Sequence, residues 1–215
     1  MSNDNQLQQA VMDELTWEPS VSQAHIGVTA KAGIVTLTGH VDSYSEKFAA
    51  EKAAGRVKGV KAVAEELEVR LPFDVQRGDE EIAAAALHRL SWDLSVPKDS
   101  VHVLVQKGRI TLTGEVEWRF QKDAAQRSMR GLAGVVGISD QVTIRPQLDA
   151  ADISSHIMTA LHRSWLDPKT ITVTAVGGKV HLTGTATSRR DRDLAESTAW
   201  AAPGAMAVQN NITIV

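Results

Sequence analysis

One short segment occurs three times along this chain, and the repetition limits what the chain can fold into. The copies read Gly33-Ile-Val-Thr-Leu-Thr-Gly-His-Val41, Gly108-Arg-Ile-Thr-Leu-Thr-Gly-Glu-Val116 and Gly178-Lys-Val-His-Leu-Thr-Gly-Thr-Ala186. Their first glycines lie 75 and 70 residues apart. A single Leu-Thr-Gly match would carry little information, but three at nearly equal spacing indicate one small unit encoded three times.

The residues before each repeated segment predict a helix and then a strand. In each predicted helix, apolar residues recur every four positions and form one buried stripe. The stripes are Leu7/Val11/Leu15, Ile82/Ala86/Leu90 and Ile153/Ile157/Leu161. In each predicted strand, apolar residues alternate with other residues. They are Ile26/Val28/Ala30, Val101/Val103/Val105 and Ile171/Val173/Ala175.

The repeated segment itself predicts a second strand with one buried face and one face in water. The apolar residues of the buried face are Val35/Leu37, Ile110/Leu112 and Val180/Leu182. The opposite face carries Thr36/Thr38, Thr111/Thr113 and His181/Thr183. This alternation is typical of a sheet that is covered on one side only.

A second helix is predicted after each Leu-Thr-Gly step. Ser43-x-x-Glu46 has the form of a capping box, and Ser188-x-x-Asp191 is a weaker relative of it. The buried stripe consists mainly of small residues, as at Ala49, Ala50, Ala53 and Ala54, so the helix can lie close to the sheet. Each copy then closes on a third strand, ending Leu67-Glu-Val69, Val142-Thr-Ile144 or Ile212-Thr-Ile214. For the first helices, Asn3 or Asp4, Asp79 and Asp149 are the predicted N-caps.

Nine glycines recur at equivalent places and are assigned structural roles. Gly33, Gly108 and Gly178 end the hairpin loops, where one residue often needs a positive φ. Gly39, Gly114 and Gly184 end the Leu-Thr-Gly step, where the strand pattern gives way to a helical one. Gly59, Gly134 and Gly204 are placed at the C-caps of the second helices.

Together these patterns predict an α+β fold of three tandem α-β-β-α-β modules. Each module is expected to be a three-stranded mixed sheet with two helices on one face. The first two strands form an antiparallel hairpin, and the second helix returns the chain so that the third strand can run parallel. The expected modules are residues 1–71, 77–146 and 148–215.

Composition excludes several classes of protein. With 43% hydrophobic and 23% charged residues the chain is globular, and its net charge of −3 does not suit a nucleic-acid binder. The absence of cysteine excludes disulfides and thiolate chemistry. The N-terminus has no signal-peptide pattern and no segment is apolar enough to span a bilayer, so we expect a soluble cytoplasmic protein, or a periplasmic one if an export signal has been removed.

No pattern of catalytic or metal-binding residues is present. The histidines His25, His40, His88, His102, His156, His162 and His181 show no metal-ligand spacing, and His40 and His181 differ between copies. They are interpreted as surface residues, as are Glu66 and Glu68 on the third strand. There is no nucleophile elbow and no phosphate-binding glycine loop. We therefore expect no enzymatic activity, no cofactor and no metal.

The tryptophans near the ends of the first helices allow two interpretations. Trp17 and Trp92 are equivalent, and Trp165 lies slightly further along its copy. The favoured interpretation is that each indole caps a core or packs against a neighbouring module. The alternative is a set of amphipathic rings at a lipid or partner surface.

The first turns of the second helices supply the preferred candidate contact residues. They differ between copies while the scaffold around them stays constant. The candidates are Tyr44 and Phe48 in copy one, Trp118, Arg119, Phe120 and Lys122 in copy two, and Arg189, Arg190 and Arg192 in copy three. Aromatic and cationic groups beside a helix N-terminus can receive a phosphate or a lipid headgroup. Ordinary divergence of exposed positions is the alternative.

The element order, the Val-Thr-Leu-Thr-Gly strand and the Gly59-Val60 and Gly134-Val135 pairs resemble the BON domains of bacterial OsmY and nodulation proteins. The resemblance covers essentially the whole chain, although Gly204 is followed by Ala205 instead of valine. It implies non-catalytic interaction modules of osmotic or envelope stress proteins, with phospholipid surfaces or other hydrophobic ligands as partners. The alternative is a protein–protein scaffold or a self-associating stress protein without a lipid ligand, motivated by possible free strand edges. A small-molecule sensor with a pocket between modules is a weaker alternative. The oligomeric state is left open.

Overall fold

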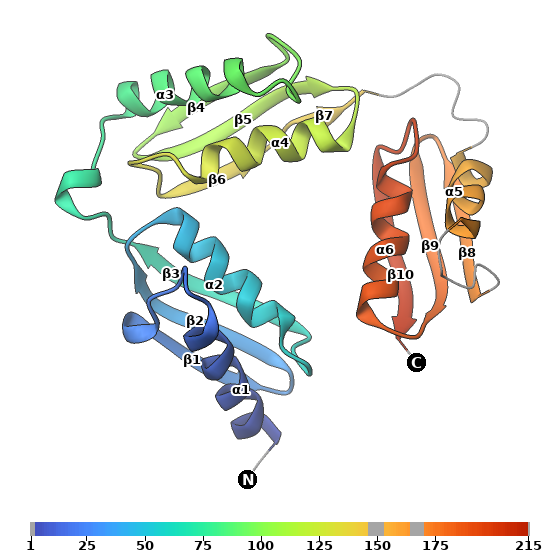
Figure 1. Cartoon of the computed structure of the whole chain (residues 1–215), viewed down its shortest axis with the longest axis horizontal. Coiled ribbons are helices and arrows are strands. Elements are labelled where there is room, and N and C mark those ends of the chain that lie inside the picture. The colour runs from blue at the N-terminus through green and yellow to red at the C-terminus, as the bar shows by residue number, and fades with distance from the viewer. Residues whose placement is uncertain (1–2, 146–152, 164–169, 215) are drawn as a thin grey trace. The chain divides into compact units, whose positions relative to one another are not determined.

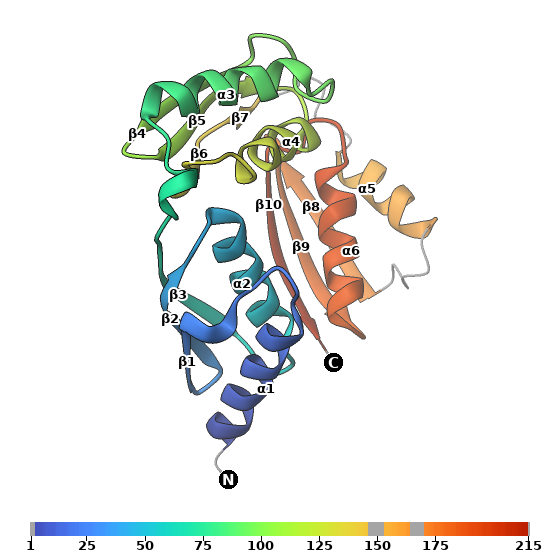
Figure 2. The ribbon, with the colours of Figure 1, turned by 60° about the vertical axis from the view of Figure 1, so that its left-hand side comes forward.

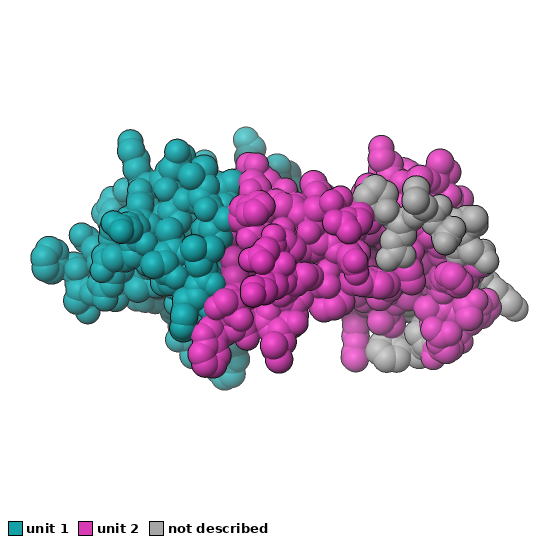
Figure 3. All heavy atoms as spheres, turned by 90° about the horizontal axis from the view of Figure 1, so that it is seen from above, with its two compact units in different colours: residues 1–89, 103–111, 127–139 teal, residues 90–102, 112–126, 140–215 magenta. Residues whose placement is uncertain are grey.

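The computed structural model describes residues 3–145, 153–163 and 170–214. Its elements follow the expected module order three times, which confirms the α+β fold (Figure 1). The chain divides into two compact units, residues 1–89, 103–111 and 127–139, and residues 90–102, 112–126 and 140–215 (Figure 3). The first module lies within the first unit, the third module lies within the second, and the middle module contributes to both.

The first module has the predicted mixed sheet. Its elements are α1 (Asn3–Trp17), the short 3-10 turn η1 (Gln23–His25), β1 (Ile26–Lys31), β2 (Ile34–Val41), α2 (Tyr44–Arg56) and β3 (Ala62–Val69). β2 is the central strand, paired antiparallel with β1 and parallel with β3. Both helices lie on the same side of this sheet (Figure 2). The parallel pairing depends on α2, which carries the chain back to the end of the sheet where β2 begins.

The middle module departs from the prediction in its third strand. A 3-10 turn, η2 (Phe73–Val75), precedes α3 (Asp79–Trp92), β4 (Val101–Gln106), β5 (Arg109–Val116), α4 (Arg119–Arg130), β6 (Gly137–Asp140) and β7 (Thr143–Ile144). The strand expected to end at Ile144 is thus interrupted at Gln141 and Val142. The Asp140 carboxylate accepts a hydrogen bond from Val142 N at 3.0 Å, and Lys122 Nζ donates to Val142 O at 2.5 Å. Equivalent bonds are made at Leu67, within the continuous strand β3, so these contacts alone do not account for the interruption.

The third module repeats the first. It consists of α5 (Ile153–His162), β8 (Ile171–Val176), β9 (Lys179–Ala186), α6 (Arg189–Trp200) and β10 (Ala207–Ile214). β9 is central, antiparallel to β8 and parallel to β10. Its predicted helix stripe, Ile153, Ile157 and Leu161, is buried together with Val180 and Leu182 of β9. The first module buries the equivalent set, with Val11 and Leu15 against Val35 and Leu37.

The glycine of the Leu-Thr-Gly step explains why the motif recurs. Gly39, Gly114 and Gly184 have φ values of 112°, 124° and 122°, which lie in the left-handed region. A Cβ atom at these positions would collide with the carbonyl oxygens of His25, Ser100 and Thr170 respectively. The residue that leads into the first strand therefore rests directly on the backbone of the second strand, and only glycine permits that approach.

The glycines predicted as helix C-caps have a different role. The C-cap of α2 is Val57 and the C-cap of α6 is Ala201, so that prediction is wrong for Gly59 and Gly204. Gly134 lies likewise beyond the end of α4 at Arg130. All three lie in the turn before the third strand and face the hairpin glycine. A Cβ on Gly108 would lie 2.8 Å from Gly134 O, and one on Gly178 would lie 2.9 Å from Gly204 O.

The predicted N-caps of the first helices also bind elsewhere. Asp4 Oδ1 accepts from Ala32 N at 2.9 Å, and Asp79 accepts from Lys107 N and Gly108 N at 2.8 Å each. Both aspartates therefore tie the start of the first helix to the hairpin turn of the same module, where they satisfy turn amides rather than helix amides. Asp149 lies outside the described residues.

Substitution of two glycines in the first module is expected to have opposite effects. Gly39→Ala combines a disfavoured backbone angle with a backbone collision, and we expect it to lower the stability of the module by about 3 kcal/mol. Gly55→Ala, in α2, meets no atom within 4 Å and is expected to raise stability by about 0.5–1 kcal/mol. Hydrogen exchange of first-module peptides measures both, because the three modules need not unfold together. Equal protection in the two variants would contradict the role given to Gly39.

Candidate functional site

The first turn of α2 is fixed by a partial capping box. Ser43 Oγ accepts from Glu46 N at 3.1 Å, as predicted. The Glu46 carboxylate does not return this bond to Ser43 and instead accepts from Asp42 N at 3.0 Å and Ser22 N at 2.7 Å. The reciprocal half of the predicted box is therefore wrong. The buried Glu46 holds the start of α2 against the connection that precedes β1.

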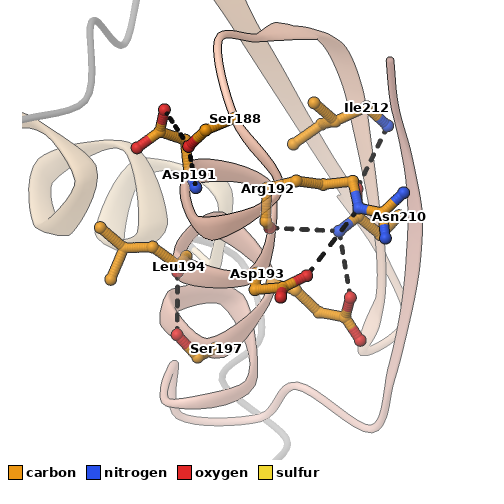
Figure 4. Close-up of polar contacts among 9 residues, drawn as sticks. Ser188, Asp191, Arg192, Asp193, Leu194, Ser197, Asn210 and Ile212 are labelled. Atoms are coloured by element: carbon orange, nitrogen blue, oxygen red, sulfur yellow. Dashed lines mark hydrogen bonds and ion pairs between the residues drawn. The ribbon is translucent and has the colours of Figure 1, made fainter. Parts of the chain in front are cut away.

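The same sequence position closes the loop before the second helix in the other modules. In the middle module Gln121 Oε1 accepts from Glu117 N and Trp118 N, both at 3.0 Å. In the third module Ser188 Oγ accepts from Asp191 N at 3.2 Å and donates to the Asp191 carboxylate (Figure 4). Asp191 also accepts from the Thr187 hydroxyl. A different acceptor at this position thus stabilises the same loop in each copy.

A second repeated contact joins the first turn of this helix to the third strand. Lys47 Nζ donates to Leu67 O at 2.6 Å and lies 2.9 Å from Glu65 Oε2. Lys122 makes the equivalent bond to Val142 O and lies 3.6 Å from Asp140 Oδ1. In the third module Asn210 Nδ2 donates to Arg192 O at 3.3 Å and Glu196 Oε2 at 3.0 Å, and Asn210 Oδ1 accepts from Ile212 N (Figure 4). Lys122 and Arg192 are both predicted ligand contacts. The Lys122 side chain therefore helps to hold its helix on the sheet, whereas Arg192 does so only through its backbone carbonyl.

An aromatic groove lies beside the start of α4, within the second compact unit. It has a volume of about 710 Å³. Its lining comprises Trp118, Arg119, Phe120, Asp123, Asp193, Glu196, Ser197, Trp200 and Ala201. Three of the nine predicted contact residues, Trp118, Arg119 and Phe120, thus come together in one groove.

Arg119 is held between an acid and a ring. Its Nε lies 2.7 Å from Asp123 Oδ1, one turn along α4, and its Cζ lies 4.3 Å from the centroid of the Trp200 ring. A guanidinium at this distance over an indole face is attracted by the negative charge of the ring face. The groove therefore already places one cation on an aromatic surface.

The start of α2 makes a related contact within the first compact unit. Arg130 Cζ lies 3.7 Å from the centroid of the Phe48 ring, and Ser45 Oγ donates to Arg130 O at 2.7 Å. Tyr44 is half-buried, and burial raises the pKa of its phenol, while the positive charge of Arg130 opposes that rise. Phe48 therefore contacts Arg130 of α4, and the charge of Arg130 affects the pKa of Tyr44. Neither Tyr44 nor Phe48 lines the aromatic groove.

The remaining predicted cations do not reach the groove. Arg189 and Arg190 are exposed at the start of α6, whereas the groove is lined by the later part of that helix. Arg192 Nε lies 3.9 Å from Asp193 Oδ1. The predicted basic cluster of the third module is thus separate from the aromatic groove.

The residues that sequence analysis missed come from the end of α6. Trp200, Glu196 and Asp193 complete the groove, and none was singled out as a contact residue. One signal was available. Trp200 lies 70 residues after Arg130, which is the repeat spacing, and both face a residue from the start of a second helix.

The tryptophans at the ends of the first helices are exposed. Trp17 is 85% exposed and Trp92 is 74% exposed, so the favoured prediction that they cap a core is wrong for both. Trp165 lies outside the described residues. Leu94, two residues after Trp92, is fully exposed at 100%. The end of α1 and the region at the end of α3 therefore each expose large apolar side chains.

The histidines show no arrangement that would support chemistry. All but His40 are exposed, and His40 stacks on His25 with ring centroids 4.4 Å apart. Among the described residues, no group of three or more His, Asp or Glu side chains is placed to hold a metal ion. Within the same residues, no helix combines the length and apolar character that a membrane crossing requires.

Comparison with known proteins gives a match to one family. The model of the BON domain matches residues 3–70, 78–146 and 149–215. The osmotically-inducible protein Y of Escherichia coli (strain K12) is 26% identical over 144 residues, which cover 65% of this chain and 72% of that protein.

Solved structures give weak overall superpositions. CdsD, a structural protein of the type III secretion system of Chlamydia trachomatis, shares 15% identity, with 98% of this chain and 92% of that chain covered at a TM-score of 0.28. The PrgH periplasmic domain shares 11% identity, with coverage of 95% and 99% and a TM-score of 0.22. Superpositions at this level carry no argument about function.

Titration of Tyr44 tests the contact between α2 and Arg130. The chain contains a single tyrosine, so tyrosinate absorbance reports this group alone. Its folded-state pKa is expected above the usual value, and Arg130→Met is expected to raise the pKa further by removing a positive charge. Because the folded state holds this proton more tightly, stability should fall as the pH rises from the unfolded to the folded pKa. Arg127→Met, an exposed change on the same helix, is the control and should leave the pKa unchanged. A pKa of Tyr44 at its usual value that Arg130→Met leaves unchanged would contradict the contact.

Proposed function

This chain belongs to the BON domain family, and on that premise we propose that its three modules form a non-catalytic binding protein of osmotic or envelope stress. Its ligands under this proposal are phospholipid surfaces or other hydrophobic ligands. The name of the Escherichia coli relative, an osmotically inducible protein, supports the stress context. The family resemblance supports a role in interaction rather than catalysis.

The exposed tryptophans are the observation that carries the proposal. Trp17 and Trp92 occupy equivalent places at the ends of α1 and α3, and both indoles lie largely in water. An indole has a large apolar body and one polar N–H, which suits the boundary between lipid headgroups and acyl chains. Two equivalent exposed tryptophans, one followed closely by an exposed leucine, favour insertion at an interface over packing within the fold.

Charge indicates how such attachment would work. The net charge is −3, so no overall electrostatic attraction draws the chain to anionic lipids. Attachment would then depend on burial of apolar side chains, which salt screens little. Each module would contribute modest affinity, with a gain when several modules engage the same surface.

The free edges of the sheets favour a second candidate function. In the first and third modules the described strands form separate three-stranded sheets whose outer strands pair on one side only. An unpaired edge can accept a strand from a partner chain. A protein–protein scaffold, or self-association, would use these edges and would need no lipid.

Flotation with phospholipid vesicles tests the lipid function. The unaltered chain is expected to bind vesicles with little dependence on salt. The double variant Trp17→Ala/Trp92→Ala is expected to bind on the order of tenfold more weakly, because two interfacial rings are lost. Val176→Ser is the matched control, since it removes an exposed apolar side chain from a hairpin of the third module.

Two outcomes would count against the lipid function. Equal binding by the double variant and the unaltered chain would remove the role of the tryptophans. Absence of binding to any vesicle, combined with a stable oligomer in light scattering, would favour the scaffold instead.

A further inference from the structure

We propose that the aromatic groove beside α4 binds an organic cation of the quaternary ammonium type. Such a group carries a positive charge inside a shell of methyl groups. The inference goes beyond the proposed function, because it uses different residues from Trp17 and Trp92 and a ligand that needs no membrane. Its chemistry is shared by choline-type lipid headgroups and by free trimethylammonium compounds.

Aromatic faces are the first reason. Trp118 and Phe120, from the start of α4, and Trp200, from the end of α6, all line the groove. Phe120 is 57% exposed, and both tryptophans are half-buried, so ring surface remains open to a ligand. The face of an aromatic ring attracts a cation, and tryptophan attracts it most strongly.

The charges on the lining are the second reason. Asp123, Asp193 and Glu196 contribute three carboxylates, and Arg119 contributes the one cation among the lining residues. Asp123 forms an ion pair with Arg119. Glu196 accepts a hydrogen bond from the neutral Asn210 amide, and this bond does not neutralise the charge of Glu196. The Asp193 side chain is 61% exposed, with Arg192 at the 3.9 Å limit of an ion pair. The lining therefore favours a cation over an anion.

The mixture of rings and acids selects the kind of cation. A small, strongly hydrated ion would lose its water against the rings without gaining enough ligands in return. A quaternary ammonium group is weakly hydrated, so its methyl groups can contact the rings while its charge faces the carboxylates. The groove volume of about 710 Å³ gives ample room for such a headgroup.

Arg119 identifies the place that the ligand would take. Its guanidinium lies over the Trp200 ring in the unliganded groove, so a ligand cation must compete with it for that face. Removal of Arg119 is therefore expected to strengthen binding, and removal of Trp200 to weaken it. A general loss of folding cannot produce these opposite signs.

Titration of the whole chain with tetramethylammonium and with choline, by calorimetry, tests the inference. Binding of both is expected, with little binding of the uncharged tert-butyl analogue of choline. Trp200→Leu should weaken binding roughly five- to tenfold and Glu196→Gln roughly threefold, whereas Arg119→Met should tighten it roughly threefold. Phe120→Ala provides a second loss variant at a more exposed ring, and Phe73→Ala, at an exposed ring outside the groove, is the control.

Several results would overturn the inference. They are absence of binding by either cation, equal binding of the uncharged analogue, or unchanged affinity in both Trp200→Leu and Phe120→Ala. Weaker binding by Arg119→Met would show that the arginine helps an anion instead. Vesicle binding that persists while cation binding is absent would overturn this inference and leave the proposed function standing.

Vesicles distinguish the two sources of the cation. If phosphatidylcholine vesicles bind better than phosphatidylglycerol vesicles, and Trp200→Leu abolishes the difference, the ligand is a lipid headgroup. If the free cation binds and the vesicles show no such preference, the ligand is a free compound. Either result supports the quaternary ammonium chemistry of the groove.

Discussion

The close approach of two backbones at the Leu-Thr-Gly glycine is the constraint on which each module depends. The carbonyl oxygens of His25, Ser100 and Thr170 occupy the space that a Cβ on the facing glycine would need. This contact joins the entry of the first strand to the later part of the second strand. In the first and third modules the second strand pairs with a neighbour on each side. Because the strand is held on both sides, the position of its last residue fixes where the second helix begins. A constant backbone thereby presents residues that differ from copy to copy.

Sequence periodicity predicted the order of elements and the mixed sheets, because burial of one face imposes periods of two and of 3.6 residues. The same patterns did not predict which residues cap the ends of the helices. Asp4 and Asp79 were assigned to helix amides beside them, yet they bind hairpin amides 28 residues away. Gly59 was assigned to a C-cap, yet it lies beyond Val57 in the next turn. In each case a bond across the module prevailed over the local one, and local pattern carries no information about such bonds.

The candidate site was predictable in part for the same reason. Trp118, Arg119 and Phe120 stood out as a dense aromatic and basic run, and they lie in one groove. Trp200 did not stand out, because it resembles an ordinary helix-end residue until its partner is known. The two cation–ring contacts also show a reversal. At the start of α2 the helix offers the ring of Phe48 to Arg130, whereas at the start of α4 it offers Arg119 to the ring of Trp200. The equivalent residues Arg130 and Trp200 thus exchange roles, while their partners lie one helical turn apart on the repeat, because Phe48 aligns with Asp123 and Arg119 aligns with Tyr44.

The central claim about cation recognition is that it belongs to these divergent helix ends and that the repeated scaffold only presents them. Amide chemical shifts of the whole chain, followed during addition of tetramethylammonium, test it most directly. The account predicts shifts confined to residues 118–123 and 193–201, with the amides around Gly39, Gly114 and Gly184 unmoved. Shifts of similar size at equivalent positions in all three modules would contradict it, because they would place recognition in the scaffold that the copies share.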